Sequence, residues 1–413
     1  MAQDASFNPE AAELQLALSL LLEQTRVDNT AVDITNALTH AIGNALPEQG
    51  MNQIELLEEL APLVLGGAAQ LGAEHALAHM DPPTPWITWV THFWNAARNQ
   101  NLLHPDVSPV AGVIERAVLQ WIAPVFGMTG GHMTPGSTVS NMTALWAARD
   151  IANIDTVIAS EAAHVSIAKS AHILGLHFKS IECDAGGCLL ETALPDSLDR
   201  CALVLTAGTT SQGAIDPLHL CGKASWTHID AAWAGPLQFS TRYKHKLCGI
   251  ETADSVAMSA HKWLFQPKES GMIMFRNTEM AHQALQSNGS YLSQPNVGLL
   301  GSHGAAAIPL FAMLKAWGRA GIEQRINRAM NNAENLVRQL RTLGDVELYS
   351  ENVSGVVLWR SNRCTTDVIL KALPLGVASS TVVDNKAWVR HVSANPNANI
   401  DLIIEHISFA LNN

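Results

Sequence analysis

The sequence predicts an α/β protein whose mostly parallel sheet is covered by helices on both sides, followed by a smaller α+β domain. Between about residues 110 and 276, short apolar strands rich in β-branched residues alternate with helices, as in doubly covered parallel sheets. After residue 305 the pattern changes to one long helix, several strand-like pieces and a final helix. The 413 residues are also more than one compact core usually holds.

The first part of the chain predicts helices and then an irregular connection. Residues 10–26 are apolar at close helical spacing, and residues 51–78 predict one or two further helices. Residues 81–109 are rich in Pro and Trp, which indicates a packed irregular segment, because exposed Trp is costly. We therefore expect a helical segment at 1–80 and a large α/β domain at 81–304. A small α+β domain should follow at 305–413.

The alternating region predicts the elements of the large domain one by one. Helices are expected at residues 113–127, 136–150 and 163–175. Strands are expected at residues 156–160, 179–183, 201–208, 227–232, 255–259 and 271–276. In the small domain we expect a helix at 305–340, broken near Gly318 or Gly321, strands at 346–350, 355–360 and 386–392, and a helix at 399–411.

Composition excludes several classes of protein. The chain has 37 acidic and 25 basic residues and no basic block, which argues against a nucleic-acid or membrane-surface partner. The six cysteines are scattered without metal-ligand spacing, so we expect reduced thiols, no metal and a cytoplasmic protein. The N-terminus lacks the basic start of a signal peptide, and no apolar run is long enough to span a membrane.

Four polar pieces fall at the carboxyl ends of predicted strands, where sheets of this kind bind ligands. The glycine-rich stretch at residues 130–141 places Ser137 and Thr138 at a helix N-terminus, which suits a phosphate. A plain N-cap is the alternative. His164 follows a strand and opens a helix, where its imidazole could lie on an aromatic ring or could be structural.

The other two pieces carry charge. Asp230 ends an apolar strand, where a carboxylate is costly without a cationic partner such as a pyridinium N–H; the alternative is a capped turn. Lys262 follows Ser259 and His261 at another strand end and is either a nucleophilic amine or a solvated surface lysine. Together with Thr210, these pieces are explained by one ligand, pyridoxal 5'-phosphate held as a Schiff base.

The chain resembles the group II pyridoxal-phosphate-dependent amino acid decarboxylases of fold type I over about residues 75–410. The resemblance rests on the motifs "NQNLLHPDVSP", "GSTVSNMTALWAAR", "SEAAHVSIAKSA", "TAGTTSQGAIDPL", "HIDAAWAG" and "SAHKWLFQPKESG". It implies a mostly parallel seven-stranded sheet and a homodimer with a shared active site. It also implies decarboxylation of an L-amino acid to the primary amine and CO₂.

The resemblance also implies roles for single residues. Lys262 would form the Schiff base, Asp230 would pair with the pyridine nitrogen, and His164 would stack on the ring. The phosphate would be held by Ser137, Thr138 and Ser259, with Thr210, Ala232 and His261 also at the cofactor. Asn101 and His104 would contact the substrate in the partner subunit's pocket. Arg390 would contact a carboxylate of the substrate, and a surface ion pair is the alternative for Arg390.

The chain departs from the family pattern in one loop. No tyrosine stands between residues 292 and 310, where relatives carry the usual donor of the proton to the α-carbon. His303 is the hypothetical replacement, and a loop histidine without a catalytic task is the alternative. An aldehyde-forming decarboxylase, an aminotransferase or a Cα–Cβ lyase therefore stays open, as does a non-enzymatic binding protein. The sequence slightly favours an acidic or small polar substrate.

Overall fold

The computed structural model describes residues 9–24, 42, 45–349 and 353–412, and it divides into two compact units, Met1–Gln70 and Leu71–Asn413. The first unit holds α1 (Ala11–Gln24) and α3 (Gln53–Val64), where helices are predicted. Residues 25 and 26 of the predicted first helix lie outside the described residues. The side chain of Asn52 accepts a hydrogen bond from the backbone N–H of Ile54 and so caps α3. The division at residue 304 stays a prediction.

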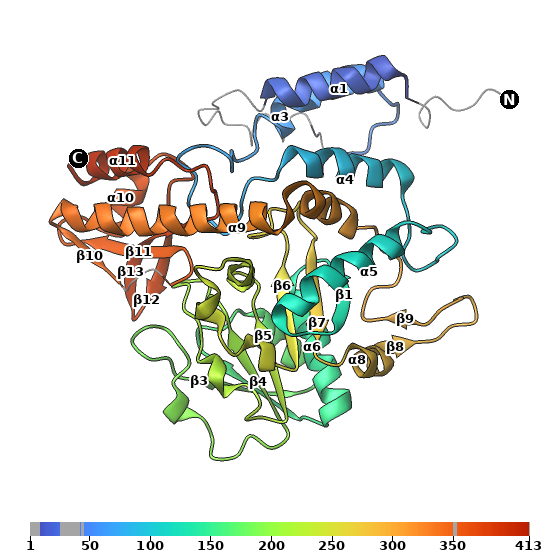
Figure 1. Cartoon of the computed structure of the whole chain (residues 1–413). Coiled ribbons are helices and arrows are strands. Elements are labelled where there is room, and N and C mark those ends of the chain that lie inside the picture. The colour runs from blue at the N-terminus through green and yellow to red at the C-terminus, as the bar shows by residue number, and fades with distance from the viewer. Residues whose placement is uncertain (1–8, 25–41, 43–44, 350–352, 413) are drawn as a thin grey trace. The chain divides into compact units, whose positions relative to one another are not determined.

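The second unit contains a seven-stranded sheet with the strand order β1-β7-β6-β5-β4-β2-β3 (Figure 1). The strands are β1 (Gly130–Thr134), β2 (Thr156–Ser160), β3 (His177–Ile181), β4 (Cys201–Thr206), β5 (Trp226–Asp230), β6 (Ser255–Ser259) and β7 (Gly271–Phe275). Six of the seven strands run in one direction, and β7 runs antiparallel to both of its neighbours, β1 and β6. The mostly parallel sheet that the sequence predicts is therefore confirmed.

Helices cover both faces of the central strands, whose successive residues point to opposite sides, whereas the edge strand β3 is mostly exposed. In β4, Leu203 and Leu205 join the core cluster that contains α5 (Ala111–Ile122), whereas Val204 joins the cluster of the other face. That other face is covered by α6 (Ser137–Ala152), α7 (Ser166–Ile173) and α8 (Thr278–Leu285). This two-sided burial explains why the strands read as nearly continuous apolar runs.

Some predicted elements differ from the structure for identifiable reasons. Residues 130–134 form the edge strand β1, although two glycines there give no strand-like pattern. A Cβ atom at Gly131 would lie 1.9 Å from the carbonyl oxygen of Ile273 in β7, so the pairing requires glycine. The helix predicted to reach residue 127 ends at Ile122, and Pro124 follows in a 3₁₀ turn. Residues 86–98, predicted to be irregular, form the helix α4 (Trp86–Arg98).

The C-terminal part of this unit contains a second, antiparallel sheet with the order β10-β11-β13-β12. Its strands are β10 (Val346–Leu348), β11 (Val356–Ser361), β12 (Ser379–Val383), which was not predicted, and β13 (Lys386–Val392). Ser350, in a predicted strand, lies outside the described residues. Helices α10 (Thr366–Ala372) and α11 (Ile400–Asn412) share an apolar core with the end of α9 (Ala307–Leu340). The predicted break in this long helix is at Gly318 (φ 59°).

The segment before α9 forms a small hairpin of β8 (Gln286–Ser287) and β9 (Asn296–Val297), which projects from the body in Figure 1. Tyr291 lies in its connection and is exposed. Within the described residues, no helix combines the length and apolar character needed to cross a membrane.

Candidate active site

A cavity of about 440 Å³ lies at the carboxyl ends of the central parallel strands. Ligands bind at this edge in open α/β sheets. Every residue predicted to bind the cofactor lines this one cavity: Ser137, Thr138, His164, Thr210, Asp230, Ala232, Ser259, His261 and Lys262. Pro135, Gly136, Val139, Thr206, Gly208 and Glu269 complete the wall, and the sequence did not assign these six residues to the cofactor.

Lys262 stands in the turn that follows β6, and its backbone N–H donates to the carbonyl oxygen of Ser259. Its side chain borders the cavity, and the residue is partly exposed. Burial lowers the pKa of the Lys262 ammonium, although the carboxylate of Asp230 acts in the opposite direction. The amine is therefore easier to deprotonate than that of a surface lysine, as a nucleophile requires.

Asp230 is 3% exposed, and its carboxylate accepts two hydrogen bonds from the protein. The side-chain amide of Asn141 donates to Oδ2 over 2.9 Å, and the backbone N–H of Ala232 donates to Oδ1 over 3.1 Å. The second bond caps the turn after β5, so the capping alternative is also real. Both donors are neutral, which leaves room for a cationic N–H on the cavity side.

His164 lies between β2 and α7, with its imidazole against the start of the helix. Its Nδ1 accepts a hydrogen bond from the backbone N–H of Ser166 over 3.2 Å and lies 2.8 Å from the Ser166 hydroxyl. Because Nδ1 accepts, the ring proton of a neutral His164 is on Nε2. The ring is thus fixed in one tautomer at the edge of the cavity.

Comparison with known proteins identifies the family that carries this site. The model of the "Pyridoxal-dependent decarboxylase conserved domain" matches residues 36–362. The chain belongs to the pyridoxal-dependent decarboxylase family. It is accordingly an amino acid decarboxylase, a carboxy-lyase that uses pyridoxal phosphate. The resemblance seen in the sequence is confirmed.

Individual relatives agree with this family. An L-2,4-diaminobutyrate decarboxylase of Rhizobium meliloti (strain 1021) is 30% identical over 87% of this chain and 81% of its own length. An aromatic-L-amino-acid decarboxylase of Bacillus atrophaeus is 26% identical over 90% of this chain and 87% of its own. The crystal structure of mouse CSAD has the same fold, with a TM-score of 0.85 at 21% identity, covering 97% of this chain and 98% of that one.

The cavity of this decarboxylase has the hydrogen-bond donors that pyridoxal phosphate needs, and some of its buried polar atoms lack a partner in the part of the chain that the structure describes. The N-terminus of α6 has no side-chain cap, and the hydroxyls of Ser137 and Ser259 hydrogen-bond to each other beside it. His261 Nδ1 and Thr206 Oγ1 are buried and have no hydrogen-bond partner among the described residues. Burial, reinforced by Lys268 and Lys262, lowers the pKa of His261 to about 4, so the ring is neutral. A phosphate would be held by hydroxyls and backbone N–H groups.

Arg390 lies next to this cavity but does not line it. Its Nε donates to the carbonyl oxygen of Thr210 over 3.0 Å, and Nη1 donates to Ala78 O and Ser379 Oγ, both over 3.3 Å. Burial lowers the pKa of Arg390 to about 10, which still leaves the guanidinium charged at neutral pH. The side chain is 7% exposed, so the alternative of a surface ion pair is wrong. Its contact with substrate stays a prediction.

The structure places the remaining predicted residues elsewhere. Asn101 donates to the hydroxyl of Ser302, and the ring of His104 lies 6.4 Å from that of Tyr291. His303 lines two neighbouring cavities of about 170 and 250 Å³ instead of the Lys262 cavity. The smaller one shares Pro135 and Glu269 with it. Within one chain, then, Asn101, His104 and His303 are not part of the cavity wall.

We expect Ser259→Ala to raise the Kd for pyridoxal phosphate by about tenfold or more, because a hydrogen bond to a charged group contributes roughly 1.5–3 kcal/mol. The Kd for pyridoxal, which lacks the phosphate, should not change. Fluorescence titration of both ligands measures this, with the exposed hydroxyl of Ser287 removed in the control Ser287→Ala. Equal losses for the two ligands would show that Ser259 does not act on the phosphate.

Proposed function

We propose that the Lys262 cavity is where this decarboxylase binds an L-amino acid and releases CO₂ to leave the primary amine. One observation carries the proposal: the lysine amine, a buried carboxylate and an uncapped helix N-terminus share a single cavity. These are the groups needed to hold pyridoxal phosphate by its aldehyde, its ring nitrogen and its phosphate. Bound pyridoxal phosphate supplies an electron sink for the bond that breaks at the α-carbon.

The chain's own residues would divide the remaining tasks. Lys262 would hold the cofactor at its aldehyde carbon, and Asp230 would keep a proton on the ring nitrogen by accepting its hydrogen bond. The fixed imidazole of His164 would cover one face of the ring. The indole of Trp263, the residue after Lys262, is buried against that of Trp233, with 4.2 Å between the ring centroids.

Release of an amine also requires a donor of the proton to the α-carbon. His303 does not line the Lys262 cavity of its own chain. In the proposal it acts in the cavity of the other subunit of a homodimer. Its Nδ1 lies 2.7 Å from the carbonyl oxygen of Gly301, so Nδ1 donates there and Nε2 can give up a proton only from the imidazolium form of the ring. The missing loop tyrosine favours one second candidate, an aldehyde-forming decarboxylase.

Purified protein loaded with pyridoxal phosphate tests the proposal. We expect an absorbance band near the visible edge that Lys262→Ala abolishes and Lys315→Ala, at an exposed lysine, retains. We also expect CO₂ and a primary amine from at least one amino acid of a broad panel. His303→Phe should slow amine release or divert the product to an aldehyde. A normal band without CO₂ from any amino acid would refute the decarboxylation at this site.

The charges around the cavity also bear on the substrate. Glu269 lines both the Lys262 cavity and the smaller neighbouring one, and its carboxylate has no hydrogen-bond or ion-pair partner among the described residues. The adjacent Lys268 is paired with Asp81, so it does not neutralise Glu269. Glu269 is also held at φ 65°, a left-handed conformation that is uncommon for a residue with a side chain and that recurs at functional sites. We propose a substrate with a cationic side chain, such as L-2,4-diaminobutyrate, on which two of the relatives act.

Substitution of Glu269 separates the substrate classes. We expect Glu269→Gln to lower kcat/KM for L-2,4-diaminobutyrate by about tenfold or more, because a charge-assisted contact is lost. Activity toward aromatic amino acids should change little, and Glu279→Gln, at an exposed carboxylate on α8, should have no effect. A wild-type preference for aspartate that survives Glu269→Gln would contradict the cationic substrate.

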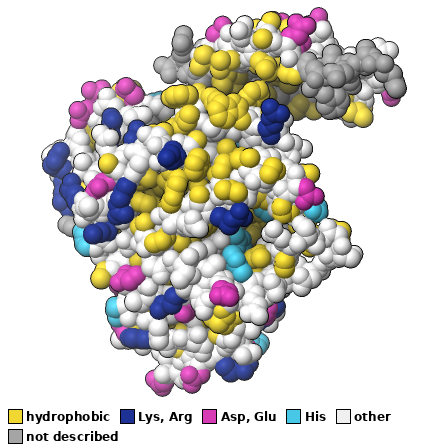
Figure 2. Space-filling model, turned by 45° about the vertical axis from the view of Figure 1, so that its right-hand side comes forward, with side chains coloured by type: hydrophobic (Ala, Val, Ile, Leu, Met, Phe, Trp, Pro, Cys, Tyr) yellow, Lys and Arg dark blue, Asp and Glu magenta, His cyan; other side chains and the backbone are white. Residues whose placement is uncertain are grey.

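A homodimer remains part of the proposal, and an apolar surface supports it. Trp86, Phe93 and Trp94 on α4 are 67%, 52% and 58% exposed, and Val113 and Trp121 on α5 are also exposed. Figure 2 shows apolar side chains gathered on the face that comes forward from the right-hand side of Figure 1. Contiguous apolar surface of this kind is unusual on a monomer and marks an interface.

We expect the wild-type protein to sediment as a dimer and Trp94→Glu to shift it toward the monomer, because a charge replaces a buried indole in the interface. Phe409→Glu, at a phenylalanine of α11 that is 65% exposed, should leave the dimer intact. Analytical ultracentrifugation over a range of concentrations measures both. A wild-type monomer at every concentration would exclude the shared site.

The proposed location is the cytoplasm. All six cysteines are free. Unpaired thiols suit a reducing compartment, which supports this part of the proposal.

A further inference from the structure

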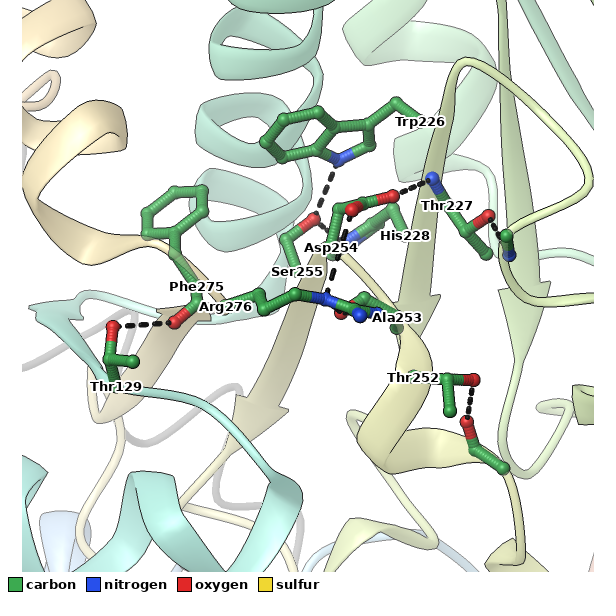
Figure 3. A network of polar contacts seen from close by, with 12 residues as sticks. Thr129, Trp226, Thr227, His228, Thr252, Ala253, Asp254, Ser255, Phe275 and Arg276 are labelled. Carbon is green, nitrogen blue, oxygen red and sulfur yellow. Dashed lines mark hydrogen bonds and ion pairs between the residues drawn. The ribbon is translucent and has the colours of Figure 1, made fainter.

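A continuous chain of buried hydrogen bonds runs from Asp230 to the far end of the sheet. Asn141 in α6 donates its Nδ2 to Asp230, and its Oδ1 lies 2.9 Å from Nε2 of His228 in β5. The other ring nitrogen of His228 lies 2.9 Å from the hydroxyl of Ser255 in β6. Trp226 Nε1 donates to that same hydroxyl over 2.9 Å. Figure 3 shows the indole of Trp226 and the imidazole of His228 meeting at Ser255.

The two end groups of this series of hydrogen bonds, Asp230 and Trp226, fix the direction of every bond in it. Trp226 can only donate through Nε1, and the Asp230 carboxylate can only accept. The Asn141 amide must therefore turn its NH₂ to Asp230 and its oxygen to His228, which places the His228 proton on Nε2. Nδ1 of His228 then accepts from Ser255, whose oxygen accepts from Trp226. Burial lowers the pKa of His228 to about 4, so the neutral ring that this pattern requires is present.

A branch of the same chain reaches His164. The Asn141 NH₂ also donates to the hydroxyl of Ser166 over 3.0 Å, and that hydroxyl lies 2.8 Å from His164 Nδ1. Since Ser166 accepts from Asn141, its own proton is available for Nδ1 of His164. One amide thus bonds the Asp230 carboxylate directly and reaches the His164 imidazole through the hydroxyl of Ser166.

We propose that Asn141 and His228 are positioning residues that hold Asp230 as an acceptor aimed at the cofactor's ring nitrogen, with Ser255 and Trp226 fixing the tautomer of His228. This inference rests on the proposed function, because it takes Asp230 as the partner of that nitrogen. All of these side chains are buried, so each polar group costs free energy unless its bond is made. A closed set of donors and acceptors with one arrangement therefore keeps Asp230 from turning away.

The test compares the binding of two ligands by the apo-protein, pyridoxal phosphate and its analogue with carbon in place of the ring nitrogen. The ratio of the two Kd values measures the contact of Asp230 with that nitrogen alone. We expect Asn141→Leu and His228→Leu to lower the preference for pyridoxal phosphate by about tenfold, as removal of supporting partners does at metal sites. His228→Gln, which can donate to Asn141 and accept from Ser255, should restore most of it.

Two further variants keep the test decisive. Ser140→Ala is the matched control on α6. It removes a buried hydroxyl that hydrogen-bonds to Thr134 over 2.7 Å, and it should leave the ratio of the two Kd values unchanged. If His228→Leu does not fold, Ser255→Ala replaces it in the test. This smaller change removes the hydrogen bond to Nδ1 of His228 and should also lower the preference for pyridoxal phosphate. Equal losses for both ligands in the Asn141 and His228 variants would overturn the inference. If Asp230→Ala also leaves the ratio unchanged, the proposed role of Asp230 fails first.

Discussion

The burial of the Asp230 carboxylate is the constraint on which the site depends. A carboxylate at the end of an apolar strand is costly unless donors surround it. The chain supplies one donor from the turn after β5 and one from α6, across the sheet face. Both are neutral, so the remaining charge is available to a cation in the cavity. This requirement accounts for an amide at Asn141, on the face of α6 that meets Asp230.

The same helix links that carboxylate to the phosphate end of the cavity. Ser137 and Asn141 are one helical turn apart in α6, so they project from the same face. The first residue lies at the uncapped N-terminus beside Ser259, and the second reaches Asp230. A shift of α6 along the sheet would therefore disturb both ends of the cofactor together. The close approach of Gly271 to Gly136, where an added Cβ would lie 2.7 Å from a backbone atom, resists such a shift.

The sequence predicts the parts of this arrangement that depend on local patterns. Apolar runs predict the central strands, and the ends of predicted strands place His164, Asp230 and Lys262 in one cavity, to which Ser137 is added by its glycine-rich helix start. The edge strand β1 escapes prediction, because its glycines are needed for close pairing and carry no strand signal. The roles of Asn141 and Ser166 could not be predicted, because their hydrogen-bond partners come from other helices and strands. His228 had a usable signal: it precedes Asp230 by two residues and so shares its strand face.

The residues that the sequence places least well are those that select the substrate and complete the reaction. Asp230 and its hydrogen-bonded chain lie in the sheet, where close packing leaves one arrangement. Glu269, His303 and Asn101 lie in connections at the rim, where few contacts restrict the backbone. Their roles depend on what meets them, a substrate or a second subunit, and one chain's pattern does not encode that partner. The cofactor chemistry can thus be inferred from the sheet, while the choice of amino acid is determined at the rim.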